Sequence, residues 1–137
     1  MDKKEVLSKL ESYAYNRARM DELQEKIDSI TYKMTPTYGN LAAAGGGFNS
    51  KVEEMGNRRH MLELRKSKYE KKVMEVRRMI EQSGLDKRER GVMWWIANNG
   101  KLQAYARREH IGKNNVYKIR DRAVNKIIAA HNSQNVV

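Results

Sequence analysis

Residues 105–127 read YARREHIGKNNVYKIRDRAVNKI, and the spacing of their apolar residues predicts how this part of the chain folds. A helix-turn-helix needs a small residue where its two helices cross, a short turn, and apolar residues on the inner face of the second helix. The stretch supplies Ala106 as the small residue. The apolar residues that follow it by five, ten and thirteen positions are Ile111, Val116 and Ile119. A basic amphipathic helix packed on an acidic protein is the alternative, and it would not require this register. The stretch therefore predicts a helix-turn-helix with residues 109–112 as its turn.

Two residues of that turn depart from the usual pattern. His110 stands where glycine is usual, and Glu109 stands where an apolar residue is commoner. The geometry of the turn is therefore the part of the motif that the residues specify least.

Burial of the helix-turn-helix core would point the opposite side chains of the second helix outward. The N-terminal half of that helix is the half that reads base edges in DNA. Lysine donates to guanine, asparagine bonds adenine through two contacts, and aspartate accepts from cytosine or holds a neighbouring arginine. The residues predicted to contact bases are Lys113, Asn114, Tyr117, Lys118 and Asp121. Four flanking arginines are predicted to contact phosphates, which supply affinity without sequence information: Arg107, Arg108, Arg120 and Arg122.

The charge of the whole chain favours a polyanionic partner. Its 137 residues carry a formal net charge of +11 and a pI near 9.9. This excess of basic over acidic residues is larger than is usual for a small cytosolic enzyme. Cysteine is absent, which excludes a disulfide framework, a thiolate nucleophile and a cysteine-based zinc site. No apolar run approaches the roughly 18 residues that a membrane span needs. We therefore expect a soluble cytoplasmic protein with no membrane partner.

Apolar residues recur at helical spacing in two long segments, at about residues 3–34 and 51–82. The second segment forms a heptad seam, which needs a partner helix. Between the segments, residues 35–50 contain the only proline and a run of three glycines, so we expect a loop there. Ser50 and Glu53 match the capping-box pattern for the start of the second helix. The two segments are therefore predicted to form a long antiparallel helical hairpin.

Three shorter helices are predicted after Ser83-Gly84, which ends the second long helix. Asp86 and Glu89 form another capping pair. Pattern and caps place these helices at about residues 87–98, 101–109 and 113–131. Trp94 and Trp95 point about 100° apart on the first of them, so one is expected to anchor the core and the other to cover an interface.

The fold class is therefore expected to be all-α, with two domains. Residues 1–84 form the helical hairpin, for oligomerisation or partner binding, and residues 85–137 form the helix-turn-helix domain. Residues 85–137 hold eleven Lys and Arg against four Asp and Glu, a net charge of +7, whereas residues 1–84 carry +4. The charge excess of the smaller domain agrees with a DNA-binding role.

Catalytic or metal-binding patterns do not stand out. The three histidines, His60, His110 and His131, show no ligand spacing with a nearby Asp or Glu. No nucleophile with its base, paired-carboxylate motif or cofactor fingerprint is recognisable. We therefore expect no catalytic residue, no metal, no cofactor and no enzymatic activity.

Residues 85–127, from LDKRERGVMWWIA to RDRAVNKI, resemble the fourth region of bacterial sigma factors, in which a helix precedes a helix-turn-helix and an Arg-Ala pair lies late in the recognition helix. With the long hairpin, the glycine-rich loop and the start SKVEEM in front, the whole chain resembles small phage-encoded transcriptional regulators of the ArpU and RinA type. This resemblance implies an activator of late phage genes that acts in the bacterial host cell and binds double-stranded DNA. The hairpin is then expected to hold a homodimer or to contact host RNA polymerase.

Two other functions stay open. A small terminase-like packaging protein also combines a helix-turn-helix with long oligomerising helices, although such subunits usually place the DNA module first. A phage inhibitor would use the hairpin to bind a host protein. The mass in solution separates the three, because a dimer favours the regulator, a large ring the packaging protein, and a monomer bound tightly to one host protein the inhibitor.

Overall fold

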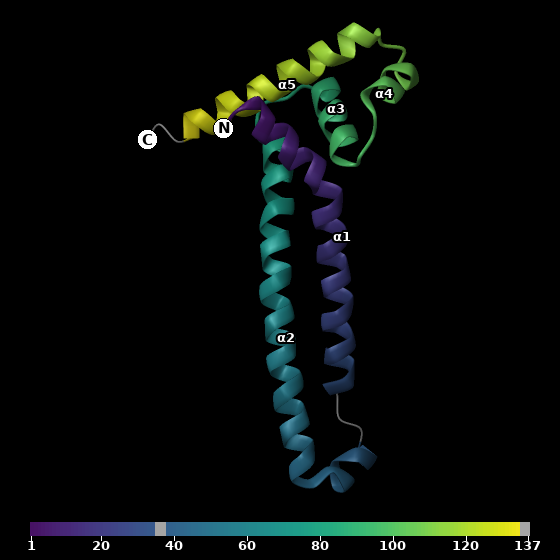
Figure 1. The fold of residues 1–137 in the computed structure, drawn as a ribbon, viewed down its shortest axis with the longest axis vertical. Helices are drawn as coiled ribbons and strands as arrows, with labels where there is room; N and C mark the ends of the chain where they lie inside the picture. The colour runs from purple at the N-terminus through teal and green to yellow at the C-terminus, as the bar shows by residue number, and fades with distance from the viewer. Residues whose placement is uncertain (35–37, 135–137) are drawn as a thin grey trace. The chain divides into compact units, whose positions relative to one another are not determined.

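The computed structural model describes residues 1–34 and 38–134, and all of its regular elements are helices (Figure 1). They are α1 (Lys3–Met34), α2 (Tyr38–Glu81), α3 (Lys87–Ala97), α4 (Leu102–Arg108) and α5 (Lys113–Gln134). No strand occurs in the described part of the chain. The all-α prediction is therefore confirmed.

The chain forms two compact units, and their boundary falls inside both long helices. One unit joins Met1–Asn16 to the chain from Lys72 onward, and the other is Arg17–Lys71. The predicted domain boundary after residue 84 stays a prediction, because these units describe packing alone. Within the first unit, the first turns of α1 and the last turns of α2 pack with the three short helices.

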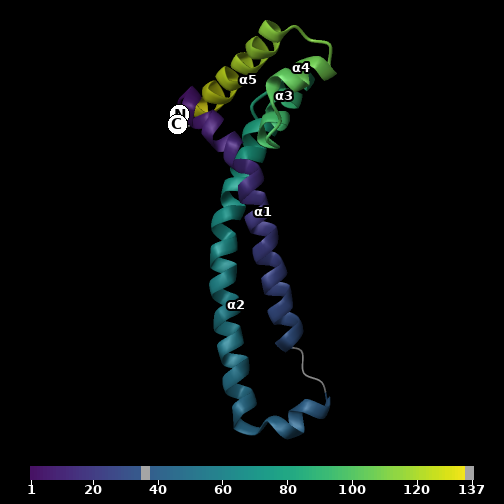
Figure 2. The same cartoon turned by 45° about the vertical axis from the view of Figure 1, so that its right-hand side comes forward.

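The first unit has a single hydrophobic core in which α3, α4 and α5 pack against one another (Figure 2). On α3 the buried residues are Glu89, Val92, Met93 and Ala97, which recur at helical spacing. The long helices add further buried side chains to this core: Val6, Leu10 and Tyr13 from α1, and Val73, Val76 and Ile80 from α2. Each fully buried side chain of this size contributes about 1.5–3 kcal/mol relative to an exposed one. The short helices therefore depend on the start of α1 and the end of α2 for part of their core.

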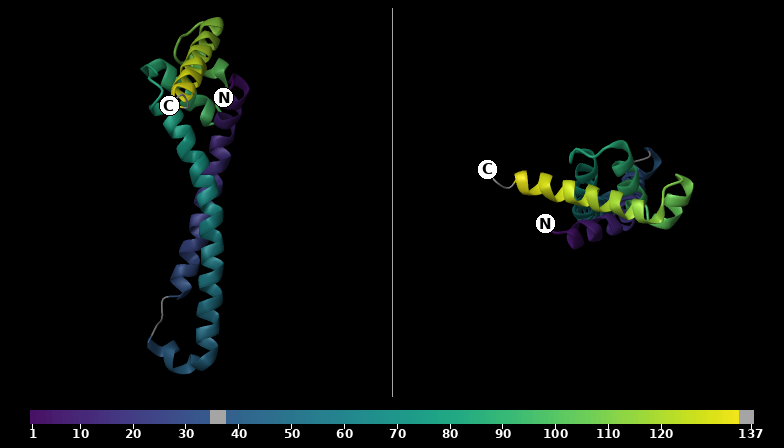
Figure 3. Two further views of the ribbon diagram at one scale, coloured as in Figure 1. Left: turned by 90° about the vertical axis from the view of Figure 1, so that its left-hand side faces the viewer. Right: turned by 90° about the horizontal axis from the view of Figure 1, so that it is seen from above.

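Polar contacts tie the start of α1 to its neighbours in this unit, and Figure 3 shows it beside α5. The Lys3 ammonium lies 2.9 Å from the Asp121 carboxylate on α5. Tyr13 packs edge-on against Trp94 of α3, with ring centroids 5.5 Å apart. Trp94 Nε1 also donates to Glu81 at 3.0 Å. Trp94 and Trp95 are both partly buried and both pack against the core, so the expected division of the pair into one core residue and one interface residue stays a prediction.

The second unit consists of the remaining parts of α1 and α2. Leu23, Ile27 and Ile30 of α1 are buried there. The Arg19 guanidinium lies over the Tyr69 ring, and Lys66 donates to Gln24. From the first of these contacts to the second, the residue number rises on α1 and falls on α2. The two stretches therefore run antiparallel within this unit.

The loop predicted for residues 35–50 is wrong for most of its length. Residues 35–37 lie outside the described residues, but α2 begins at Tyr38 and its backbone continues through Ser50. Ser50 is therefore not the first residue of a helix, and the capping box predicted for Ser50 and Glu53 is wrong. An interior glycine costs a helix about 1 kcal/mol relative to alanine. The strong helix formers of the LAAA stretch that precede the glycines offset part of that cost.

The capping pair predicted for α3 is confirmed. Asp86 Oδ1 accepts a hydrogen bond from the Glu89 backbone N–H at 2.8 Å, and Glu89 Oε1 accepts one from the Asp86 N–H at 3.0 Å. Lys126 of α5 donates to the same Glu89 oxygen at 2.6 Å, although the Glu89 side chain is only 1% exposed. The cap therefore also joins the start of α3 to α5.

Replacing Asp86 with Ala is expected to lower the melting temperature by several degrees, because the Glu89 N–H loses its acceptor at the start of α3. Melting followed by circular dichroism at neutral pH measures the effect. Asp86→Asn is the matched control, since asparagine caps a helix about as well as aspartate. An equal loss in both variants would contradict the capping role.

The same carboxylate gives the stability a pH dependence. The hydrogen bond from the Glu89 N–H holds the pKa of Asp86 below its usual value of 3.8. Because the pKa is lower in the folded state, the contribution is fully present well above pH 3.8 and is lost as the pH falls through the folded pKa. Asp86→Asn is expected to remove this part of the loss of stability at acid pH. A melting temperature that depends on pH as in the wild type would contradict the role of Asp86.

Candidate nucleic-acid interface

The turn between α4 and α5 closes α4 with two backbone hydrogen bonds. The Ile111 N–H donates to the Ala106 carbonyl at 2.8 Å, and the His110 N–H donates to the Arg107 carbonyl at 3.4 Å. His110 has φ 54°, in the left-handed region. This pattern is a Schellman motif, in which the residue after the C-cap is left-handed and is usually glycine.

The apolar register predicted for residues 106–119 is buried as expected. Ala106 is 4% exposed, Val116 0% and Ile119 5%, while Ile111 is partly buried against the same core. Ala123, Val124 and Ile127 continue the inner face of α5. Ala106 lies in the core cluster with Val116 and Ile119, where a small side chain lets α4 and α5 come close together.

The left-handed His110 explains why glycine is usual at this position. A left-handed residue with a Cβ costs about 1–2 kcal/mol, and glycine escapes this cost. A second Schellman motif ends α3, where Asn99 is left-handed with φ 64°. The Asn99 N–H donates to the Ile96 carbonyl and the Gly100 N–H donates to the Trp95 carbonyl. Asparagine tolerates this conformation better than most side chains.

His110→Gly is expected to stabilise the protein by about 0.5–1 kcal/mol, because the relief of the left-handed strain exceeds the entropy that glycine gains in the unfolded chain. The melting temperature would rise by roughly 3 °C. Asn99→Gly is the matched control and should gain less. A fall in stability for His110→Gly would show that the imidazole holds the turn by a contact of its own.

Three of the residues predicted to contact bases form an open surface on the first turns of α5. Lys113, Asn114 and Lys118 are exposed. Their side chains make no ion pair or hydrogen bond with any other described residue. Asn114 and Lys118 lie on the face opposite Val116 and Ile119, whereas Lys113, three residues before Val116, is exposed at the first residue of α5. All three are free to meet a ligand without breaking an ion pair or hydrogen bond.

The other two predicted base contacts are engaged within the protein. The Asp121 carboxylate binds Lys3 at 2.9 Å and the Arg120 guanidinium at 3.0 Å. These two cations, Lys3 first, hold the pKa of Asp121 below its usual range. Tyr117 is half-buried, and the Arg120 guanidinium carbon lies 5.0 Å from its ring centroid. Of the two roles expected for Asp121, the structure therefore shows the one in which it holds a neighbouring arginine.

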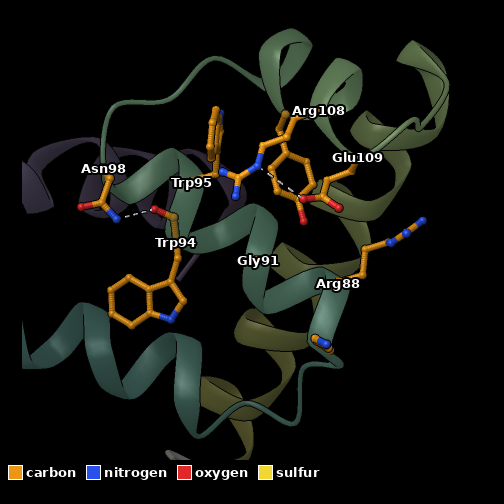
Figure 4. Close-up of a pocket in the computed structure, with 9 residues that line it drawn as sticks. Arg88, Gly91, Trp94, Trp95, Asn98, Arg108 and Glu109 are labelled. Atoms are coloured by element: carbon orange, nitrogen blue, oxygen red, sulfur yellow. Dashed lines mark hydrogen bonds and ion pairs between the residues drawn. The ribbon is translucent and has the colours of Figure 1, made fainter.

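The four arginines predicted to contact phosphates fall into two groups. Arg107 and Arg122 are exposed and pair with no described residue. Arg120 is held by Asp121 and Tyr117, as described above. Arg108 lies over the Trp95 ring at 5.6 Å and 3.8 Å from the Glu109 carboxylate (Figure 4). Arg107 and Arg122 are therefore the arginines that can reach a phosphate at no internal cost.

A cavity between α3 and α4 escaped the sequence analysis. Trp95, Tyr105 and Arg108 contribute to its lining (Figure 4). Two glycines beside the rings, Gly91 and Gly100, were the signal for this cavity in the sequence. A Cβ at Gly91 would lie 2.7 Å from the Tyr105 hydroxyl oxygen, and one at Gly100 would collide with the Trp95 indole. Trp94 also lines this cavity, and both tryptophans are partly buried.

Comparison with protein-family models, curated proteins and solved structures finds no match for this chain. No group of three His, Cys, Asp or Glu side chains in the described residues is placed to hold a metal ion. Among those same residues, no helix combines the length and apolar character needed to cross a membrane. The function is therefore argued from the geometry of α4 and α5.

Proposed function

We propose that this protein is a transcription regulator that binds double-stranded DNA, with α4 and α5 as its helix-turn-helix and α5 as the recognition helix. The observation that carries the proposal is the combination of two faces on α5. Its inner face is buried through Val116 and Ile119, Asn114 and Lys118 stand free on the outer face, and Lys113 is exposed at the first residue of the helix. Lysine and asparagine are the side chains that suit guanine and adenine edges in the major groove.

The charge of the chain supports a nucleic-acid partner. Arg107 before the turn and Arg122 on α5 add unpaired cations beside the base-reading residues. Such cations gain affinity by releasing counterions from the phosphates. Phosphate contacts hold the protein in place, and base contacts choose the sequence.

The resemblance to sigma region four and to phage regulators of the ArpU and RinA type supports a narrower proposal. In it, the protein activates late phage genes in the host cytoplasm, and the long helices contact a second copy or host RNA polymerase. Met61 and Leu64 support a protein partner for the long helices, because they are 52% and 49% exposed and lie three residues apart on one face of α2. A two-fold dimer would present two recognition helices to two half-sites.

Replacing Asn114 or Lys118 with Ala is expected to weaken binding to the preferred duplex by about 1–3 kcal/mol while changing binding to unrelated duplexes less. The preferred duplex is the one that the wild-type chain enriches from a random pool. Fluorescence anisotropy on both duplexes measures the difference. Asn125→Ala is the matched control, because Asn125 is exposed on the same face of α5 but lies about two turns beyond Lys118 and about three turns beyond Asn114.

Each variant should melt like the wild type, since these side chains lack internal contacts. If Asn114→Ala and Lys118→Ala weaken binding to all duplexes equally, α5 is a basic surface that does not read bases. If Asn125→Ala loses as much specificity as Asn114→Ala and Lys118→Ala, the assignment of base contacts to the N-terminal half of α5 is wrong.

The salt dependence of binding tests the phosphate contacts. Arg107→Ala and Arg122→Ala are each expected to flatten the log–log slope of affinity against salt by about 0.9, because one phosphate contact is lost. Binding to all duplexes should weaken by a similar factor. Lys68→Ala removes the same charge from an exposed position in the other unit and should leave the slope unchanged. An equal change in Lys68→Ala would mean that net charge, not these two arginines, drives binding.

A further inference from the structure

The cavity between α3 and α4 has a volume of about 810 Å³ (Figure 4). Its lining comes from α3, α4 and the adjoining Asn98 and Glu109, and no residue of α5 belongs to it. A ligand held there would therefore not use the outward side chains of α5. We call this cavity the α3–α4 pocket.

Two aromatic rings of the pocket are fixed before any ligand arrives. Trp95 Nε1 donates to the Lys101 carbonyl at 2.8 Å, and the Trp95 and Tyr105 ring centroids are 5.5 Å apart. Gly91 and Gly100 leave the space that these rings occupy. Rings held in this way lose little conformational entropy when a partner binds.

The mouth of the pocket is basic. Lys87, Arg88 and Arg108 contribute to its lining, against one carboxylate from Glu109. Arg108 pairs with that carboxylate, whereas Lys87 and Arg88 are exposed and pair with no described residue. The two free cations complement an acidic ligand.

We propose that the α3–α4 pocket is a docking site for a short acidic segment of a partner protein. One apolar side chain of the segment packs against Trp95 and Tyr105, and its carboxylates bind Lys87 and Arg88. Trp, Tyr and Arg are the residue types that dominate binding energy in protein interfaces. A nucleic acid fits less well, because a base needs an open ring face for stacking and Arg108 already lies over the Trp95 ring.

The test is a selection of random twelve-residue displayed peptides on the full chain, followed by titration of a synthetic copy of the enriched peptide. The expected consensus carries Asp or Glu beside Leu, Phe or Trp. Binding to the wild-type chain is measured from the anisotropy of a fluorescently labelled copy of the peptide, which leaves every residue of the pocket in place. Arg88→Glu is expected to weaken binding at least tenfold through charge reversal, a change of about 1.4 kcal/mol.

Lys4→Glu is the matched control, because Lys4 is exposed, unpaired and outside the pocket, and binding should change less than twofold. Lys87→Glu replaces Arg88→Glu if the latter melts below the wild type. The proposal is overturned if no consensus is enriched, if the consensus lacks acidic residues, or if Lys4→Glu weakens binding as much as the pocket variant. Displacement of the peptide by a single-stranded oligothymidylate would assign the pocket to nucleic acid instead.

Discussion

The packing of α5 on α4 across the turn at residues 109–112 is the constraint on which the candidate site depends. Ala106 accepts the hydrogen bond from Ile111 that closes the turn, and Val116 and Ile119 are then buried. Once this register is set, helical geometry leaves Asn114 and Lys118 on the opposite face. A slip of one residue would rotate α5 by about 100° and bury the wrong side chains.

The three short helices could be predicted from the sequence nearly to their ends, because local signals mark them. Asp86 and Glu89 cap α3 as predicted, and left-handed residues end α3 and α4. The start of α2 was missed because glycines and a proline suggested a loop where the helix formers beside them extend the helix to Tyr38. The division of the chain inside α1 and α2 was not predictable, because the helical pattern continues unbroken across it and only packing with other segments reveals it.

The candidate site was predictable where exposure follows from the helix alone. Lys113, Asn114 and Lys118 are free as expected. Asp121 holds its neighbour Arg120 as one of its expected roles, but its contact with Lys3 and that of Arg108 with Trp95 join different helices, and no spacing in the sequence connects them. The α3–α4 pocket was missed for the same reason, since its rings come from two helices and only the glycines beside them hint at the contact.

The most direct test of the account is a map of backbone amide chemical shifts during titration with duplex DNA, because it locates the interface without any substitution. The account predicts that the largest shifts lie at Arg107, at residues 112–118 and at Arg122, with small shifts at Lys87 and Arg88 in the α3–α4 pocket. Largest shifts within Arg17–Lys71, or no shifts on α5, would contradict the claim that α5 reads DNA.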